Sequence, residues 1–94
     1  METQFYIVFN MKTPEGWEQF AKFFIGNKRE DAKKLFSMLK GTKEVQESYP
    51  LTIDFMETVN ELPVNLNMIN CSLAQLGDNT VIITKELFGR HILK

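Results

Sequence analysis

The sequence predicts an α+β domain, a two-layer sandwich in which an antiparallel four-stranded sheet carries two helices on one face. Three observations predict it. Several short segments are aromatic, β-branched or alternately apolar, as strands are. Two longer segments have apolar residues at helical spacing after capping residues. The same order of signals occurs twice, giving ββαββα. The chain has 94 residues, and a chain of this size holds a single core, so we expect one domain over residues 1–94.

The first strand is predicted at Phe5–Phe9, where every residue is aromatic or β-branched. The segment 13–16, Thr-Pro-Glu-Gly, follows it and has the proline and glycine positions of a type I turn. Residues 17–25 fit two interpretations. Trp17, Phe20 and Phe24 fit a helical stripe, while residues 23–25 are typical of a strand that leaves a hairpin.

The first helix is predicted at residues 28–40. Asn27 is a suitable N-cap, and Glu30 stands at the capping-box spacing from it. Gly41 is expected to end the helix as the residue after its C-cap. Apolar residues recur at helical spacing at Ala32, Leu35, Phe36 and Leu39.

The second half predicts a hairpin and a long helix. Residues 51–56 and 64–69 alternate in polarity, and a turn is expected at 60–63. Ser72 and Gln75 have capping-box spacing, which predicts a helix from 73 to about 92, although Gly77-Asp78-Asn79 weakens it. The expected apolar face of this helix is Leu73, Leu76, Thr80, Ile83 and Leu87.

An internal repeat bears on the ambiguous segment. A shift of 45 residues superposes Met11-Lys12-Thr13 on Met56-Glu57-Thr58, and the expected caps Asn27 and Ser72 on each other. Few letters match, so the agreement lies in the order of the signals. The repeat favours a strand at 17–25. The alternative is a βααββα order in which residues 14–25 are helical.

Composition excludes several classes of protein. The net charge is −1, which provides no overall attraction for nucleic acid or acidic membranes. Cys71 is the one cysteine, so an internal disulfide and a cysteine-based zinc site are excluded. No apolar run approaches the length of a membrane span. We therefore expect a cytoplasmic protein without cofactor or metal, which has no membrane partner.

The first strand is apolar on both faces, because Phe5, Ile7 and Phe9 alternate with Tyr6 and Val8. Two helices on one face leave the other face open, so a second surface is expected to cover it. We expect a homodimer, or a protein or small-molecule ligand, with Tyr6, Val8 and Phe24 at the interface. The alternative is that long neighbours such as Lys22 and Met56 shield the open face.

No catalytic constellation is recognisable, so the chain is expected not to be an enzyme, and its function stays unknown. His91 is near the C-terminus with no nucleophile close in sequence. Cys71, before a helix N-terminus, is interpreted as a small buried residue rather than an activated thiol. Asp54 and Glu57 are expected on opposite faces of their strand.

The best ligand candidate is an anion site at Asn27, Lys28 and Arg29, where free N–H groups begin the first helix. The alternative function is a nucleic-acid-binding domain that uses strand aromatics and the basic first helix. Because acidic residues interrupt this basic run, nucleic acid is the less favoured partner. The basic residues are Lys28, Arg29, Lys33, Lys34, Lys40 and Lys43.

Overall fold

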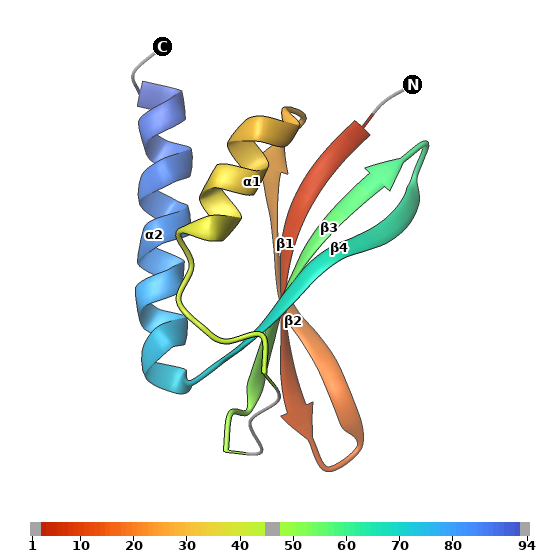
Figure 1. Ribbon diagram of the computed structural model, residues 1–94, viewed down its shortest axis with the longest axis vertical. Coiled ribbons are helices and arrows are strands. Elements are labelled where there is room, and N and C mark those ends of the chain that lie inside the picture. The colour runs from red at the N-terminus through yellow and green to blue at the C-terminus, as the bar shows by residue number, and fades with distance from the viewer. Residues whose placement is uncertain (1–2, 45–47, 93–94) are drawn as a thin grey trace.

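The computed structural model describes residues 3–44 and 48–92, with side chains described as far as Gly89 (Figure 1). Its elements follow the predicted ββαββα order, which confirms the fold class. The elements are β1 (Thr3–Thr13), β2 (Gly16–Gly26), α1 (Arg29–Ser37), β3 (Leu51–Val59), β4 (Leu62–Cys71) and α2 (Leu73–Ile92).

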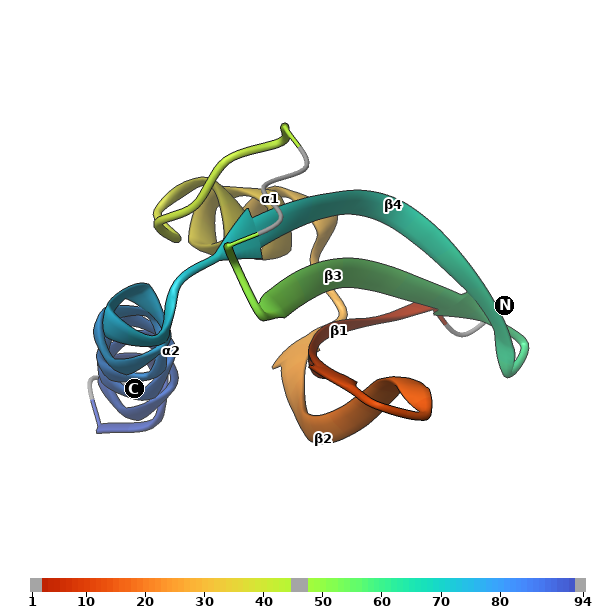
Figure 2. The same ribbon diagram turned by 90° about the horizontal axis from the view of Figure 1, so that it is seen from below.

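The four strands form one antiparallel sheet in the order β2-β1-β3-β4, and both helices lie on the same side of it (Figure 2). The two hairpins therefore meet through their first strands, with Ile7 opposite Phe55. The ambiguous segment is strand β2, so the alternative with residues 14–25 helical is wrong. The extended conformation is stabilised in this segment because β2 pairs with β1 along its whole length.

Both hairpin turns are tight and each contains two residues between the last strand pair. In the first turn the Thr13 hydroxyl accepts a hydrogen bond from the Glu15 N–H and donates one to the Gly16 carbonyl. In the second turn Asn60 and Glu61 have φ of 52° and 69°. Two consecutive residues in the left-handed region match the twist that paired strands require of a hairpin turn.

The core lies between the sheet and the helices. Odd-numbered residues of β1 and β3 point into it, as their alternation predicts, and even-numbered residues, among them Val8, Asp54 and Met56, take the other face. Phe36 of α1 stacks on Phe55, with ring centroids 5.2 Å apart. The buried cluster comprises Phe5, Ile7, Phe9, Ile25, Ala32, Leu35, Phe36, Leu51, Ile53, Phe55, Ile69, Cys71 and Ile83.

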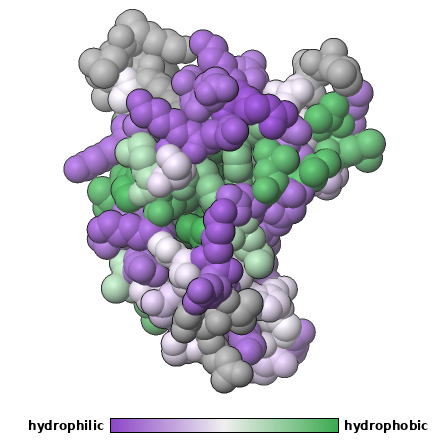
Figure 3. Space-filling model, viewed as in Figure 1, coloured by the Kyte–Doolittle hydropathy of each residue, from purple (hydrophilic) through white to green (hydrophobic). Residues whose placement is uncertain are grey.

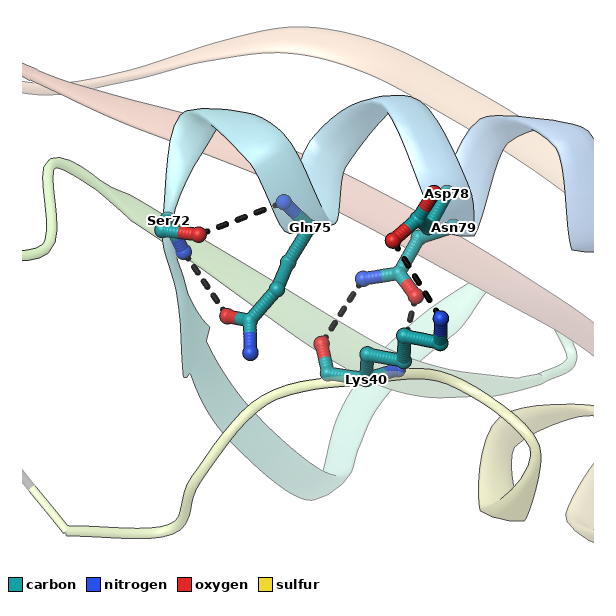
Figure 4. Close-up of polar contacts among 5 residues, drawn as sticks. All are labelled: Lys40, Ser72, Gln75, Asp78 and Asn79. Atoms are coloured by element: carbon teal, nitrogen blue, oxygen red, sulfur yellow. Dashed lines mark hydrogen bonds and ion pairs between the residues drawn. The ribbon is translucent and has the colours of Figure 1, made fainter.

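Helix α1 is shorter at both ends than the predicted 28–40. Lys28, not Asn27, is the N-cap, and its side chain makes no capping hydrogen bond. The helix ends at Ser37 because Lys40 is bonded elsewhere: its N–H donates to Asn79 Oδ1 at 2.7 Å, and its C=O accepts from Asn79 Nδ2 at 2.8 Å (Figure 4). Gly41 is needed for close approach, since a Cβ there would lie 2.6 Å from the Asn70 carbonyl oxygen.

Helix α2 begins with the predicted capping box and continues through Gly77 without a break. The Ser72 N–H donates to Gln75 Oε1 at 2.9 Å, and the Gln75 N–H donates to Ser72 Oγ at 3.2 Å (Figure 4). The buried face differs from the predicted one at two positions, since Leu73 is 63% exposed and Thr80 is exposed as well. Asn79 is fully buried while Thr80 is exposed, because the amide of Asn79 holds the chain that follows α1.

The repeat is real in its order of elements, but its offset is not a constant 45 residues. The last residue before the hairpin turn is Thr13 in the first half and Val59 in the second, an offset of 46 residues. The helices start at Arg29 and Leu73, an offset of 44 residues. The pairing of β2 with β1 has two irregularities and that of β4 with β3 has one. The extra residues in β2 account for part of this drift.

Candidate functional site

The candidate site is the sheet face opposite the helices, here named the uncovered face. Strand register sets its members in rows across the sheet. One row holds Phe24, Tyr6, Met56 and Asn65; the next holds Lys22, Val8, Asp54 and Met68; a third holds Gln19, Asn10, Thr52 and Asn70.

A polar group occupies the middle of the uncovered face. Asn10 Nδ2 donates to Thr52 Oγ1 at 3.2 Å and to Asp54 Oδ2 at 3.0 Å. Asp54 Oδ1 is buried and has no hydrogen-bond partner, alone among the described buried side-chain nitrogens and oxygens. A buried carboxylate oxygen without a donor is costly, so it marks a position where a further donor would be stabilising.

An aromatic and cationic group lies beside it on β1 and β2. The rings of Tyr6 and Phe24 are 5.5 Å apart between centroids, and the Lys22 ammonium lies 4.4 Å from the Tyr6 centroid. The Tyr6 hydroxyl donates to Gln4 Oε1 at 2.8 Å. Phe24 is 52% exposed. The group therefore presents an exposed ring and an exposed cation next to an acidic centre.

The three predicted interface residues all lie on the uncovered face, but they differ in exposure. Phe24 is well exposed and Tyr6 is half-buried, whereas Val8 is only 7% exposed. Lys22 is the cross-strand neighbour of Val8 on this face, so shielding by a long side chain applies at that position. The exposed apolar surface therefore lies away from Val8. It includes Trp17 and Met68 on the edge strands.

A second group of exposed apolar side chains lies at the end of the β3–β4 hairpin (Figure 3). Leu62, Val64 and Leu66 belong to it, with Leu62 70% exposed. Leu62 and Val64 pair with Val59 and Glu57, so they share the helix side of the sheet rather than the uncovered face. This group has no polar centre comparable to that of Asp54.

The predicted anion-site residues lie together at the start of α1, but one of them is already engaged. The Arg29 guanidinium pairs with the Glu57 carboxylate and lies 5.4 Å from the centroid of the Phe5 ring. The positive charge of Arg29 is therefore already paired with Glu57 at the edge of the core. Asn27 and Lys28 are exposed, and the Lys28 side chain makes no capping hydrogen bond. The anion site stays a prediction.

The candidate catalytic groups are kept apart. Asp54 lies on the uncovered face and Glu57 on the helix side, as the spacing predicts. Cys71 is fully buried, and this burial raises the pKa of its thiol from 9.0 to about 11, which opposes activation as a nucleophile. His91 falls within α2, but its side chain lies outside the described residues.

Among the side chains that the structure describes, in residues 3–44 and 48–89, no cluster of three or more His, Cys, Asp or Glu residues is placed to hold a metal ion. Over residues 3–44 and 48–92, no helix has the length and apolarity to cross a membrane. Comparisons with protein-family models, with curated proteins and with solved structures found no match to this chain.

Sequence reasoning missed the two residues that organise the described polar contacts. Asn79 was interpreted as a helix-weakening residue, yet it is buried and ties α2 to Lys40. Asn10 received no role, yet it joins Thr52 and Asp54. The sequence did contain a signal for Asn10. Because side chains alternate along a strand, Asn10 lies on the same face as Tyr6 and Val8, where a polar residue stands out.

Proposed function

We propose that this chain is a small non-enzymatic interaction domain that binds a protein partner through the uncovered face of its sheet. The observation that carries the proposal is the set of exposed apolar side chains on this face, Trp17, Phe24 and Met68, which lie around the hydrogen-bonded polar group at its centre. Met68 is directly opposite Asp54 on β4 and is 43% exposed. Interfaces commonly combine aromatic and methionine side chains with a few polar groups that fix orientation.

The nucleic-acid alternative needs the basic residues of α1 and the strand aromatics on one surface. Tyr6 and Phe24 lie on the uncovered face, and α1 packs on the opposite side of the sheet. Two of the basic side chains are already in ion pairs: Arg29 with Glu57, and Lys40 with Asp78 at 3.2 Å. We therefore favour a protein partner.

Photo-crosslinking tests this proposal without knowledge of the partner. A benzophenone amino acid replaces Phe24 on the uncovered face, or Val81 as a matched control, since both side chains are about half exposed at 52% and 51%. In cells that express the chain, the probe at position 24 is expected to give a product of discrete mass, and the probe at 81 none. The absence of any discrete product from position 24 would contradict the proposal.

A further inference from the structure

The charges on the uncovered face are arranged so that the face is complementary to itself. One row across the sheet runs Lys22, Val8, Asp54, Met68 in the order of strands β2, β1, β3 and β4. The cation therefore lies on the β2 side of the sheet centre and the anion on the β3 side. A twofold rotation that exchanges these two sides brings opposite charges of two copies together.

Two simple twofold axes lie in the plane between two stacked sheets, and the charges distinguish them. An axis across the strands at this row puts Lys22 over Lys22 and Asp54 over Asp54, which like-charge repulsion opposes. An axis along the strands, between β1 and β3, puts β2 over β4 and β1 over β3 of the other copy. Asp54 then lies opposite Val8 and one strand spacing, about 4.8 Å, from the position opposite Lys22.

The same arrangement matches the apolar residues. Tyr6 comes opposite Met56 of the second copy, and sulfur–aromatic contacts of this kind are favourable. Lys22 comes opposite Met68, along which its aliphatic stem can lie while its ammonium reaches the carboxylate. No like charges oppose each other in the rows of Phe24, Lys22 and Gln19.

The area is sufficient for a specific, reversible dimer. The face spans four strands at about 4.8 Å each and roughly 30 Å along the strands, or about 600 Å² in plane per copy. Two copies then bury roughly 1,200 Å² together, the lower end of the range for specific interfaces. An interface of this size is expected to dissociate on dilution.

We propose, on the basis of the proposed function, that the uncovered face binds a second copy of this chain, with Lys22 of each copy paired to the Asp54 carboxylate of the other. In the dimer Lys22 leaves the Tyr6 ring and approaches the Asp54 carboxylate of the other copy; because Oδ1 is buried within one chain, the side chains that cover it move aside to admit the ammonium. The twofold symmetry gives two such pairs, so each Lys22 and each Asp54 of the dimer takes part in one pair.

Charge exchange tests the pairing. The chain is 11.0 kDa, and sedimentation equilibrium of the wild type is expected to show the dimer mass at tens of micromolar and the monomer mass on dilution. Lys22→Asp and Asp54→Lys each place like charges in contact and are expected to raise Kd at least tenfold. An equimolar mixture of the two variants is expected to restore the dimer, since the mixed pair has opposite charges at both contacts.

Two controls keep the test informative. Lys85→Asp changes an exposed charge on α2 and is expected to leave Kd unchanged. Asp54→Asn keeps the shape of the side chain, so it serves if Asp54→Lys fails to fold by circular dichroism. The wild-type Kd is expected to rise between 50 and about 500 mM salt, and that of Asp54→Asn to rise far less.

The outcomes separate this proposal from the proposed function. A wild type that stays monomeric at about 100 μM overturns the dimer, given the affinity expected of such an area. A dimer indifferent to Lys22→Asp and Asp54→Lys overturns the pairing. In either case, a crosslinked product from position 24 with a mass other than the dimer mass leaves the interaction domain standing with a different partner.

Discussion

The two faces of the sheet are built from the same strands but hold together in different ways. On the helix side, Ile7 and Ile53 are fully buried among aromatic rings, and the contacts are almost entirely apolar. On the uncovered face, Asn10, Thr52 and Asp54 form a small hydrogen-bonded group that leaves one oxygen unpartnered. We propose that the difference separates two tasks: the helix side provides most of the free energy of folding, and the uncovered face binds a partner.

The comparison would fail if side chains on both faces contributed equally to stability. Phe9→Ala removes a ring that is 1% exposed and packs against the ring of Phe23 at 5.5 Å. We expect it to lower the free energy of unfolding by about 3–5 kcal/mol, a large share of the total for a domain of this size. Urea denaturation followed by circular dichroism, at a protein concentration that keeps the chain monomeric, measures the loss.

The matched control is Val8→Ala, one position away on the uncovered face. Val8 is shielded by neighbouring side chains rather than by a helix, and the change removes only two methyl groups, so we expect a smaller loss of about 1.5 kcal/mol. Equal losses for Phe9→Ala and Val8→Ala would show that the uncovered face is part of the folding core, and the separation of tasks would be wrong.

The helix side also depends on polar contacts, among them those of the fully buried Asn79. Asn79→Ala leaves the backbone N–H and C=O of Lys40 without their partner. Each unsatisfied group costs about 1–3 kcal/mol, so we expect a loss of about 2–4 kcal/mol and faster hydrogen exchange at the Lys40 amide. Thr80→Ala, on the exposed neighbour, is expected to change stability by less than about 0.5 kcal/mol. A loss for Asn79→Ala no larger than that of Thr80→Ala would rule out the role given to Asn79.

Alkaline pH is expected to lower the free energy of unfolding through the buried thiol of Cys71. Burial raises the pKa of its thiol from the ordinary 9.0 to about 11 in the folded chain. The unfolded chain therefore loses the proton first, and the folded state is destabilised as pH rises from 9 towards 11, by roughly 2–3 kcal/mol. Below pH 9 both states keep the proton, so this contribution to the pH dependence vanishes.

Cys71→Ala isolates that effect from the titration of lysines and tyrosines. The variant lacks the thiol but keeps the other groups, so the difference in unfolding free energy between wild type and variant is expected to fall as pH rises from 9 to 11. Urea denaturation at several pH values in this range measures the difference. Parallel pH profiles for the two proteins would mean that Cys71 is not protected in the folded state.

The sequence predicted those features that depend on local alternation. The strands, both turns and the long helix follow from side-chain periodicity and capping residues, and the order of signals in two halves resolved β2 as a strand. Features that depend on contacts distant in sequence were missed. The end of α1 is set by Asn79, 39 positions away from Lys40, and no pattern around Ser37 signals it.

The sequence predicted that the residues of the candidate site share one face of the sheet, but not how exposed each of them is. Alternation placed Tyr6, Val8 and Phe24 on one face, which the register confirms. It could not show that Val8 is shielded, because that depends on the neighbouring strand. Irregular pairing also moves residues between faces: strict alternation over residues 64–69 would put Asn65 and Asn67 on one face, whereas a shift between Phe55 and Met56 places them on opposite faces.

The two faces are compared most sharply by a variant on the uncovered face that is expected to change the stability of the monomer very little. Phe24→Ser removes a half-exposed ring whose described ring contact is with Tyr6 at 5.5 Å. We expect the monomer to lose less than about 1 kcal/mol of unfolding free energy, while Kd of the dimer rises at least tenfold. Denaturation of the dilute protein and sedimentation of the concentrated protein measure the two quantities separately.

Val81→Ser on α2 is the control for Phe24→Ser, since it removes an equally exposed apolar side chain from a surface outside the uncovered face. It is expected to change neither quantity appreciably. A fall in monomer stability for Phe24→Ser with no change in Kd would reverse the comparison, because the uncovered face would then stabilise the chain itself. A change in Kd alone means that the surface contributes to association and little to folding, as the unpartnered carboxylate of Asp54 indicates.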